Sequence, residues 1–140
     1  MSGQYRPAIL INIDVDDLDR AVAFYTRVLQ LDVGRRLGPD VVELIGGAAP
    51  IYLLRKASGS IAARSSTATR DYARHWTPLH LDLVVDDVDA AVARAQAAGA
   101  IVEDAARDHV WGRIAHLADP FGHGFCVLAF RNAGYDEVAT

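Results

Sequence analysis

Apolar side chains recur along this chain with a helical spacing in two separate segments. In the first segment they fall at every third or fourth position, at Leu18, Ala21, Val22, Tyr25, Val28 and Leu29. The second segment repeats the spacing at Val88, Ala91, Val92, Ala95 and Ala98. This periodicity is typical of a helix that buries one face. We therefore predict two amphipathic helices.

Both predicted helices begin inside an internal repeat. Residues 15–23 and 85–93 are identical at seven of nine positions when the chain is shifted by 70 residues. Alternating apolar and polar residues, which indicate a strand, precede each copy at 11–15 and 81–85. Short β-type runs follow each helix, at 41–45 and 51–54 in the first half and at 101–102, 109–117 and 125–130 in the second. The pattern predicts an α+β fold of two βαβββ halves, residues 8–56 and 78–130.

Acidic residues mark where each helix should begin. Asp16 and Asp86 stand just before the apolar stripes, and aspartate is a favoured residue at a helix N-terminus. Gly99 follows the second stripe and can adopt the left-handed conformation that ends a helix. We expect Asp16 and Asp86 to cap the helices and to have no other role.

Composition narrows the class of protein. The 140 residues fit a single domain, and a net charge of −4 without any basic block argues against a nucleic-acid partner. No run approaches the about 20 apolar residues that span a membrane, and residues 1–7 do not form a signal-peptide core. The single cysteine excludes an internal disulfide and fits a reducing compartment. We expect a cytoplasmic protein that does not bind membranes.

The segment that joins the halves has a different composition. Residues 57–77 are rich in Ser, Ala, Thr and Arg, and the basic side chains in and beside the segment outnumber the single acidic one, Asp71. One interpretation is a solvated linker. The other is a lid that steers an anionic ligand toward a pocket.

Three motifs resemble the vicinal oxygen chelate superfamily, in particular its glyoxalase-like and bleomycin-resistance-like branch. They are the helix opening at 15–25, its second copy at 85–93, and the Asp-Pro-Phe-Gly turn at 119–122 that leads into the last strand. The resemblance covers about residues 8–130. It implies one glyoxalase/bleomycin-resistance-like domain over residues 1–140, in which a curved mixed sheet surrounds a concave pocket and the helices lie outside. It also implies a homodimer.

The resemblance implies a metal site that this chain matches poorly. Metal-binding members supply histidine or a substitute from the first strand of each half, and glutamate from the last strand of each half. The matching positions here are Leu10 and His80, then Tyr52 and Cys126. Because a hard divalent ion needs carboxylate and imidazole donors, His80 is the one matching ligand. We expect no metal or other cofactor, with an unorthodox divalent metal as the less favoured alternative.

Strand alternation selects the residues that should line the pocket. Leu10, Asn12, His80 and Asp82 lie opposite the apolar positions of their strands, and Tyr52, Cys126, Leu128 and Trp111 are expected to complete the wall. Asp82 could orient His80 as a general base, although a histidine with a purely structural hydrogen bond is an equally simple interpretation. Cys126 is expected to pack as a small apolar residue. The other four histidines show no spacing that indicates a site.

These residues leave three functional hypotheses. The first is a largely metal-free protein that binds a small hydrophobic or aromatic molecule, including an anionic one. The second is a lyase or isomerase of glyoxalase type, or a dioxygenase-like enzyme, in which His80 acts as base or metal ligand. The third is a ferredoxin-like regulatory domain, which would leave the Asp-Pro-Phe-Gly turn unexplained.

Overall fold

Residue 3 and residues 6–140 are described by the computed structural model of the protein. The N-terminal stretch considered above therefore lies partly outside the described residues. The chain divides into two units, one up to Ala57 and one from Ser58 onward. The segment at 58–77 thus belongs to the second unit, and each unit is described by itself.

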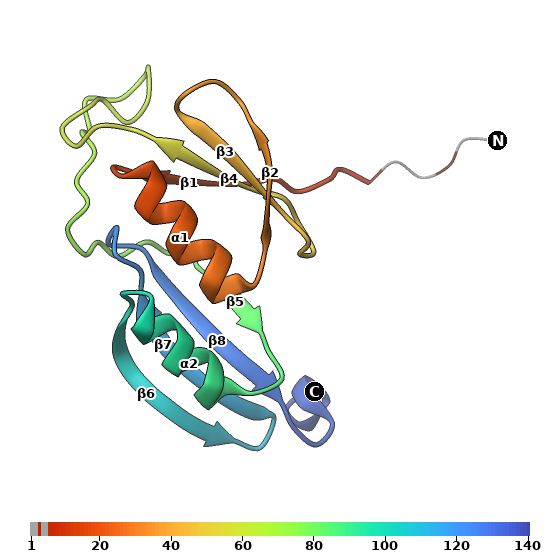
Figure 1. Ribbon diagram of the computed structural model, residues 1–140. Helices are drawn as coiled ribbons and strands as arrows, with labels where there is room; N and C mark the ends of the chain where they lie inside the picture. Colours follow the sequence, from red (N-terminus) through yellow and green to blue (C-terminus); the bar gives the residue numbers. More distant parts are fainter. Residues whose placement is uncertain (1–2, 4–5) are drawn as a thin grey trace. The chain divides into compact units, whose positions relative to one another are not determined.

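The first unit is a four-stranded mixed sheet with one helix (Figure 1). Its elements are β1 (Ile11–Val15), α1 (Leu18–Leu29), β2 (Asp32–Arg36), β3 (Val41–Ile45) and β4 (Ile51–Arg55). The strand order is β1-β4-β3-β2, with β1 parallel to β4 and the other pairs antiparallel. Helix α1 contacts β2, β3 and β4, so it covers one face of the sheet.

The second unit repeats this arrangement. Its elements are β5 (Leu81–Val84), α2 (Val88–Ala97), β6 (Ile101–His109), β7 (Gly112–Ala118), β8 (Gly124–Phe130) and a short 3₁₀ helix, η1 (Gly134–Glu137). The strand order is β5-β8-β7-β6, again with one parallel pair, β5 and β8. The prediction of an α+β fold from two βαβββ halves is confirmed.

The sequence pattern missed strand β2. Its residues, Asp32-Val-Gly-Arg-Arg36, lack apolar alternation because β2 is the edge strand of the sheet and is largely exposed. Packing also requires a glycine at position 34, since a Cβ atom there would stand 2.6 Å from Oε1 of Glu43. The carboxylate of Glu43, on the neighbouring strand β3, fills the space beside Gly34.

The helix caps lie one residue later than predicted. Asp17 and Asp87, not Asp16 and Asp86, accept hydrogen bonds from the backbone N–H groups of Arg20 and Ala90, each at 3.0 Å. The carboxylate must stand three residues before the N–H group it caps, which the second aspartate of each pair does. Gly99 ends α2 with a φ of 113°, as predicted.

The core of each unit lies between its helix and its sheet. In the first unit, Leu44 and Leu53 have no exposed surface, and Phe24 of α1 is 1% exposed. In the second, Ala91 and Ala95 of α2 and Val127 of β8 are buried in the same way. The opposite face of each sheet is therefore left to carry polar groups. Among the described residues, no helix is long and apolar enough to cross a membrane.

Candidate functional site

A row of polar side chains crosses the second sheet on the face away from α2. Asp82 on β5 pairs with Cys126 on β8, and Cys126 pairs with His116 on β7. Residues that pair directly across neighbouring strands point to the same face. Three adjacent strands thus place a carboxyl, a thiol and an imidazole side by side.

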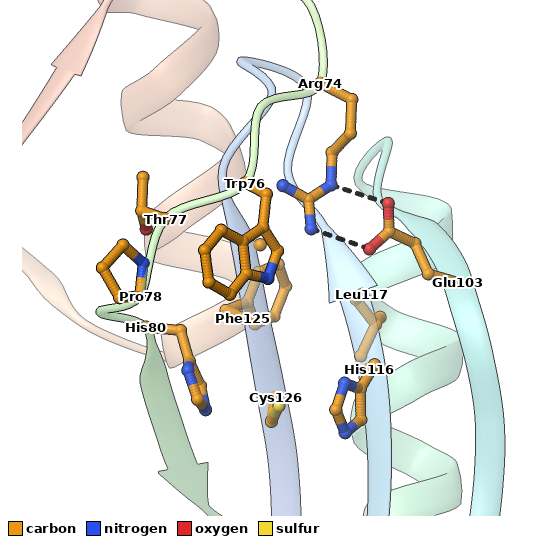
Figure 2. Close-up of a pocket in the computed structure, with 11 residues that line it drawn as sticks. Arg74, Trp76, Thr77, Pro78, His80, Glu103, His116, Leu117, Phe125 and Cys126 are labelled. Carbon is orange, nitrogen blue, oxygen red and sulfur yellow. Dashed lines mark hydrogen bonds and ion pairs between the residues drawn. The ribbon is translucent and has the colours of Figure 1, made fainter.

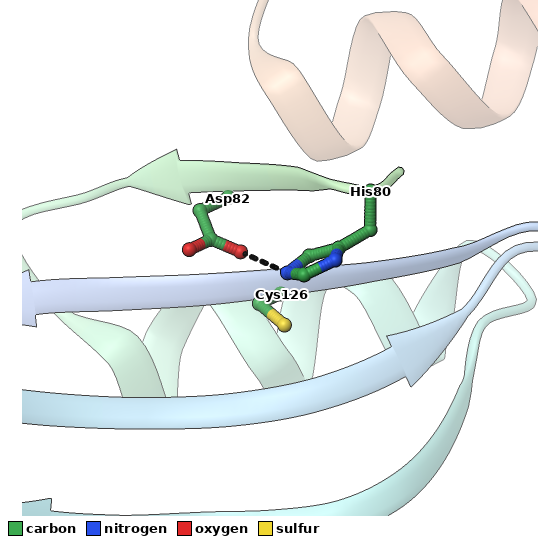
Figure 3. A group of neighbouring side chains, drawn as sticks. All are labelled: His80, Asp82 and Cys126. Atoms are coloured by element: carbon green, nitrogen blue, oxygen red, sulfur yellow. Dashed lines mark ion pairs between the residues drawn. The ribbon is translucent and has the colours of Figure 1, made fainter. Parts of the chain in front are cut away.

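His80 joins this row from just before β5. Its Nε2 atom lies 3.1 Å from Oδ1 of Asp82, so the imidazole donates this hydrogen and keeps Nδ1 for other contacts (Figure 3). The ligand atoms of His80, Asp82 and Cys126 all lie within 4.8 Å of one another. The structure brings together these three residues, which the sequence placed on one face.

The Cys126 thiol is held in its protonated form. Burial, followed by the Asp82 carboxylate, raises the pKa of this thiol to about 12. Only the thiolate is an effective nucleophile or metal ligand. At neutral pH, Cys126 therefore serves as a small buried group, and its side chain is 3% exposed.

A segment of the joining region, residues 72–78, is fastened over this sheet, and we call it the strap. Arg74 donates from Nε and Nη2 to the Glu103 carboxylate of β6, at 2.7 and 2.9 Å. Its Nη1 donates to the carbonyls of His75 and Gly122. The backbone N–H of His75 also donates to the carbonyl of Gly122, at 3.1 Å. This part of the joining region is docked on the second sheet, unlike a solvated linker.

A pocket with a volume of about 220 Å³ lies between the strap and the second sheet (Figure 2). The exposed Trp76 ring stands at its mouth, with His80 and His116 on either side of Cys126. Eleven residues line it, all from the second unit: Arg74, Trp76, Thr77, Pro78, His80, Glu103, His116, Leu117, Gly124, Phe125 and Cys126. The volume suits a small ligand, since pockets for drug-sized molecules usually have volumes of about 300–1,000 Å³.

Five residues proposed for the pocket wall do not line this cavity. Leu10, Asn12 and Tyr52 belong to the first unit, and Leu128 and Trp111 belong to the second. Leu128 is on β8 but is 1% exposed and packed into the core. Trp111 lies in the turn between β6 and β7, where its ring stacks on His109 and contacts Tyr135 of η1 at 5.2 Å. Trp111 thus packs against Tyr135 of the C-terminal segment, and no periodicity in that segment predicts this contact.

Most residues of the pocket wall were not selected from the sequence, among them His116 and Trp76. His116 could have been found, because counting outward from the 119–123 turn pairs Ala118 with Gly124 and hence His116 with Cys126. Trp76 could not, because no periodicity reports how an irregular segment docks.

The first unit has an equivalent row of residues. Asn12 pairs with Tyr52, and Tyr52 pairs with Glu43, so these positions match Asp82, Cys126 and His116. The Tyr52 hydroxyl donates to Oε2 of Glu43 at 2.8 Å. Arg35 binds the same carboxylate through Nε at 3.0 Å and Nη2 at 2.6 Å. Leu10 is 56% exposed. These contacts make a closed polar network on this sheet.

The side chains at the family's ligand positions do not fit a hard divalent ion. Leu10 has no donor atom, and the hydrogen bond to Glu43 raises the pKa of the Tyr52 phenol, which keeps it protonated. Cys126 carries its proton as well. His80 with Asp82 and Cys126 forms the one cluster of three donor atoms among the described residues, and this set would suit a softer ion once the thiol has lost its proton.

The Glu43 network predicts a specific acid dependence of stability. Hydrogen bonds from Arg35 and then Tyr52 lower the pKa of Glu43 from 4.5 to about 2. A lowered carboxyl pKa stabilises the fold above the ordinary value, and that contribution is lost as pH falls toward about 2. Urea unfolding of the wild type should therefore show a decline between pH 4.5 and 2 that is smaller in Glu43→Gln. The exposed Glu137→Gln is the control, and an equal decline in all three proteins would contradict the prediction.

Comparisons with known proteins agree with this architecture. The family model described as a glyoxalase-like domain matches residues 10–128. The protein Mb0911c of Mycobacterium bovis is 34% identical over 146 aligned positions, covering 99% of this chain and 93% of the relative. The anthracycline biosynthesis protein DauV of a Streptomyces species is 34% identical over 126 positions, covering 88% of this chain and 41% of DauV.

A solved structure extends the comparison. A glyoxalase/bleomycin resistance protein/dioxygenase family enzyme from Burkholderia phytofirmans superposes with a TM-score of 0.68 at 24% identity, over 87% of this chain and 97% of that one. The two-module fold is that of the vicinal oxygen chelate superfamily. Within it, this chain belongs to the glyoxalase-like domain family.

Proposed function

We propose that this protein binds a small, neutral aromatic molecule in the pocket of its second half without a metal ion. The cavity of about 220 Å³, with the Trp76 ring at its mouth and Phe125 in its wall, is the observation that carries the proposal. Aromatic rings gain about 0.5–1.5 kcal/mol from stacking beyond the area they bury. The relative DauV is named for anthracycline biosynthesis, and this name is consistent with an aromatic ligand.

The charges around the pocket favour a neutral ligand over an anion. Arg74 is the one arginine or lysine in the pocket wall, and its guanidinium already binds the Glu103 carboxylate through two nitrogens and backbone carbonyls through the third. The Asp82 carboxylate lies beside the floor. An anion would have to compete with these two carboxylates, so electrostatic repulsion opposes its binding.

Trp76→Ala should weaken binding of 2-naphthol by about 3- to 10-fold, because the variant removes the stacking surface. Isothermal titration would measure the affinity, and Trp111→Phe is the matched control, since Trp111 lies outside the cavity. The anion 2-naphthoate has the same ring system and should bind more weakly than 2-naphthol. Equal affinity for the wild type and Trp76→Ala would rule out this pocket, and tighter binding of 2-naphthoate would establish an anionic ligand instead.

The second candidate is a lyase or isomerase of glyoxalase type. It is favoured by the contact of 3.1 Å between His80 and Asp82, which can hold the imidazole in one tautomer with Nδ1 available to take a proton from a substrate. Cys126 is too weakly acidic to act as its nucleophile. This proposal uses His80 as a general base and Asp82 as the residue that orients it.

Metal analysis tests the metal-free part of the first proposal. Protein purified without added metal or chelator should contain no stoichiometric ion, and its melting temperature should not change with Mn²⁺, Fe²⁺, Ni²⁺, Zn²⁺ or chelator. A stoichiometric ion that is lost in both His80→Ala and Cys126→Ser would favour an enzyme in which His80 is a metal ligand instead of a general base, because these residues supply the donor atoms. Leu10→Ala is the control, because leucine supplies no donor.

We also propose that the protein is cytoplasmic and forms a homodimer. A single cysteine is compatible with the reducing cytoplasm, and the family resemblance supports a homodimer. Light scattering of the purified chain would decide between a monomer of 15.1 kDa and a dimer.

A further inference from the structure

Two histidines from distant parts of the chain meet where the strap docks. Nδ1 of His123, in the turn before β8, lies 3.0 Å from Nε2 of His75 in the strap. Their rings are 4.8 Å apart and nearly perpendicular, at 81°. Both side chains are partly buried. The contact is a hydrogen bond between two imidazoles, so its existence depends on which nitrogens carry hydrogen.

The surroundings of His75 assign these hydrogens. Nδ1 of His75 lies 3.1 Å from the carbonyl oxygen of Ala73, which can only accept, so this nitrogen carries the hydrogen. A neutral imidazole has one N–H group, which leaves Nε2 of His75 as the acceptor. Nδ1 of His123 must then be the donor. The bond is lost once Nε2 of His75 and Nδ1 of His123 both carry hydrogen.

Charged and titratable groups surround the pair. On the strap, Tyr72 has its ring 6.5 Å from that of His123, Asp71 accepts from the backbone of Ala73, and Arg74 is adjacent. From the turn, Asp119 accepts the backbone N–H of His123 at 2.9 Å. From β6, Glu103 binds Arg74. The positive Arg74 opposes a second proton on the pair, and its ion pair partly neutralises the Glu103 carboxylate.

We propose that the His75–His123 pair is a proton-sensitive latch that holds Trp76 in the wall of the pocket at neutral pH and releases it under mildly acidic conditions. Trp76 follows His75 directly in the chain, and β5 begins only at Leu81. Arg74 keeps its contacts with the Glu103 carboxylate on acidification, because its hydrogen bonds lower the pKa of Glu103. The change is therefore limited to the part of the strap after Arg74.

The direction of the pH effect follows from the acceptor nitrogen. Histidine changes its charge between about pH 5 and 8. A first proton still leaves one hydrogen shared between the two facing nitrogens, so the bond stays in place. A second proton, on Nε2 of His75, puts two N–H groups opposite each other and two positive charges side by side. This second proton is incompatible with the docked strap. The strap is therefore docked most firmly near pH 8 and is released as the pH falls toward about 5.

Hydrogen exchange of the His75 amide tests this latch, because that amide donates to Gly122 only when the strap is docked. Its protection factor, corrected for intrinsic exchange, should be about 2- to 10-fold lower at pH 5.5 than at pH 7.5. The amide of Arg70, which donates to Ser60 in the preceding loop, is the internal control and should not change.

The variant His75→Gln/His123→Asn keeps an acceptor and a donor at the bonded positions but cannot take up a proton in this range. Its protection at position 75 should stay high at both pH values, whereas His123→Ala should be poorly protected at both. A wild type whose protection does not change with pH, or a double variant that loses protection together with the wild type, would overturn the proposal.

If the variants do not fold, a measurement on the wild type still tests the latch. Imidazole ¹⁵N spectra at pH 7.5 should show hydrogen on Nδ1 and none on Nε2 of His75, and the reverse tautomer would also overturn the latch. Release of 2-naphthol at low pH rests on the proposed function. The amide and imidazole measurements need no ligand, so failure of ligand binding and failure of the latch are separate results.

Discussion

Gly122→Ala should detach the strap and destabilise the second half. Gly122 has a φ of 83°, and a Cβ atom there would stand 2.2 Å from the carbonyl oxygen of Ala73. The left-handed backbone costs alanine about 1–2 kcal/mol, and overpacking adds a further ~1–3 kcal/mol. Urea unfolding should show this loss, and 2-naphthol affinity should fall with it because Trp76 is displaced.

Gly59→Ala separates the two contributions to this effect. Gly59 has nearly the same φ, 81°, but nothing lies within 4 Å of the position its Cβ would take. This variant should lose only the backbone contribution and keep its affinity for 2-naphthol. Equal effects of the two substitutions would show that the contact between Gly122 and the strap does not form.

Phe121→Ala should have the largest effect on stability among the substitutions considered. Phe121 is the third residue of the Asp-Pro-Phe-Gly turn, and its side chain has no exposed surface. Truncation of a buried phenylalanine to alanine costs about 3–5 kcal/mol, because apolar contacts are lost and a cavity remains. The free energy of unfolding from urea titration measures this loss.

Phe130→Ala is the control for this prediction. Phe130 is 45% exposed at the end of β8, so its truncation should cost clearly less. If Phe121→Ala lost no more stability than Phe130→Ala, the Asp-Pro-Phe-Gly turn would not be anchored in the core. The backbone of the turn would then depend on Asp119, whose Oδ1 accepts the N–H groups of Phe121 and His123 at 2.8 and 2.9 Å.

Periodicity accounts for what could be predicted of the fold. A helix has a period of about 3.6 residues and a strand a period of 2, so the repeat, the two helices and most strands are visible in the spacing of apolar residues. Strand β2 was missed because an exposed edge strand has no buried face to impose alternation. The caps were displaced by one residue because both aspartates of each pair are chemically suitable, and only backbone geometry distinguishes Asp17 from Asp16.

Strand alternation likewise accounts for the part of the candidate site that could be predicted. His80, Asp82 and Cys126 were placed on one face by strand alternation, and their donor atoms do converge. Trp111 was chosen as the pocket tryptophan, but the tail residue Tyr135 and His109 pack around it instead, and Trp76 stands at the pocket. Neither tryptophan lies in a periodic element, so the sequence could not distinguish them.

The sequence by itself determined the two βαβββ halves and the face of the sheet that carries the polar row, because these depend on local periods and on pairing counted from a turn. Only the tertiary structure decided how the strap docks, which tryptophan reaches the pocket and that His75 meets His123, 48 residues away. Such contacts depend on irregular backbone that packs against distant residues. Their energy comes from single hydrogen bonds and close fits, as at Gly122, which leave no repeating pattern in the chain.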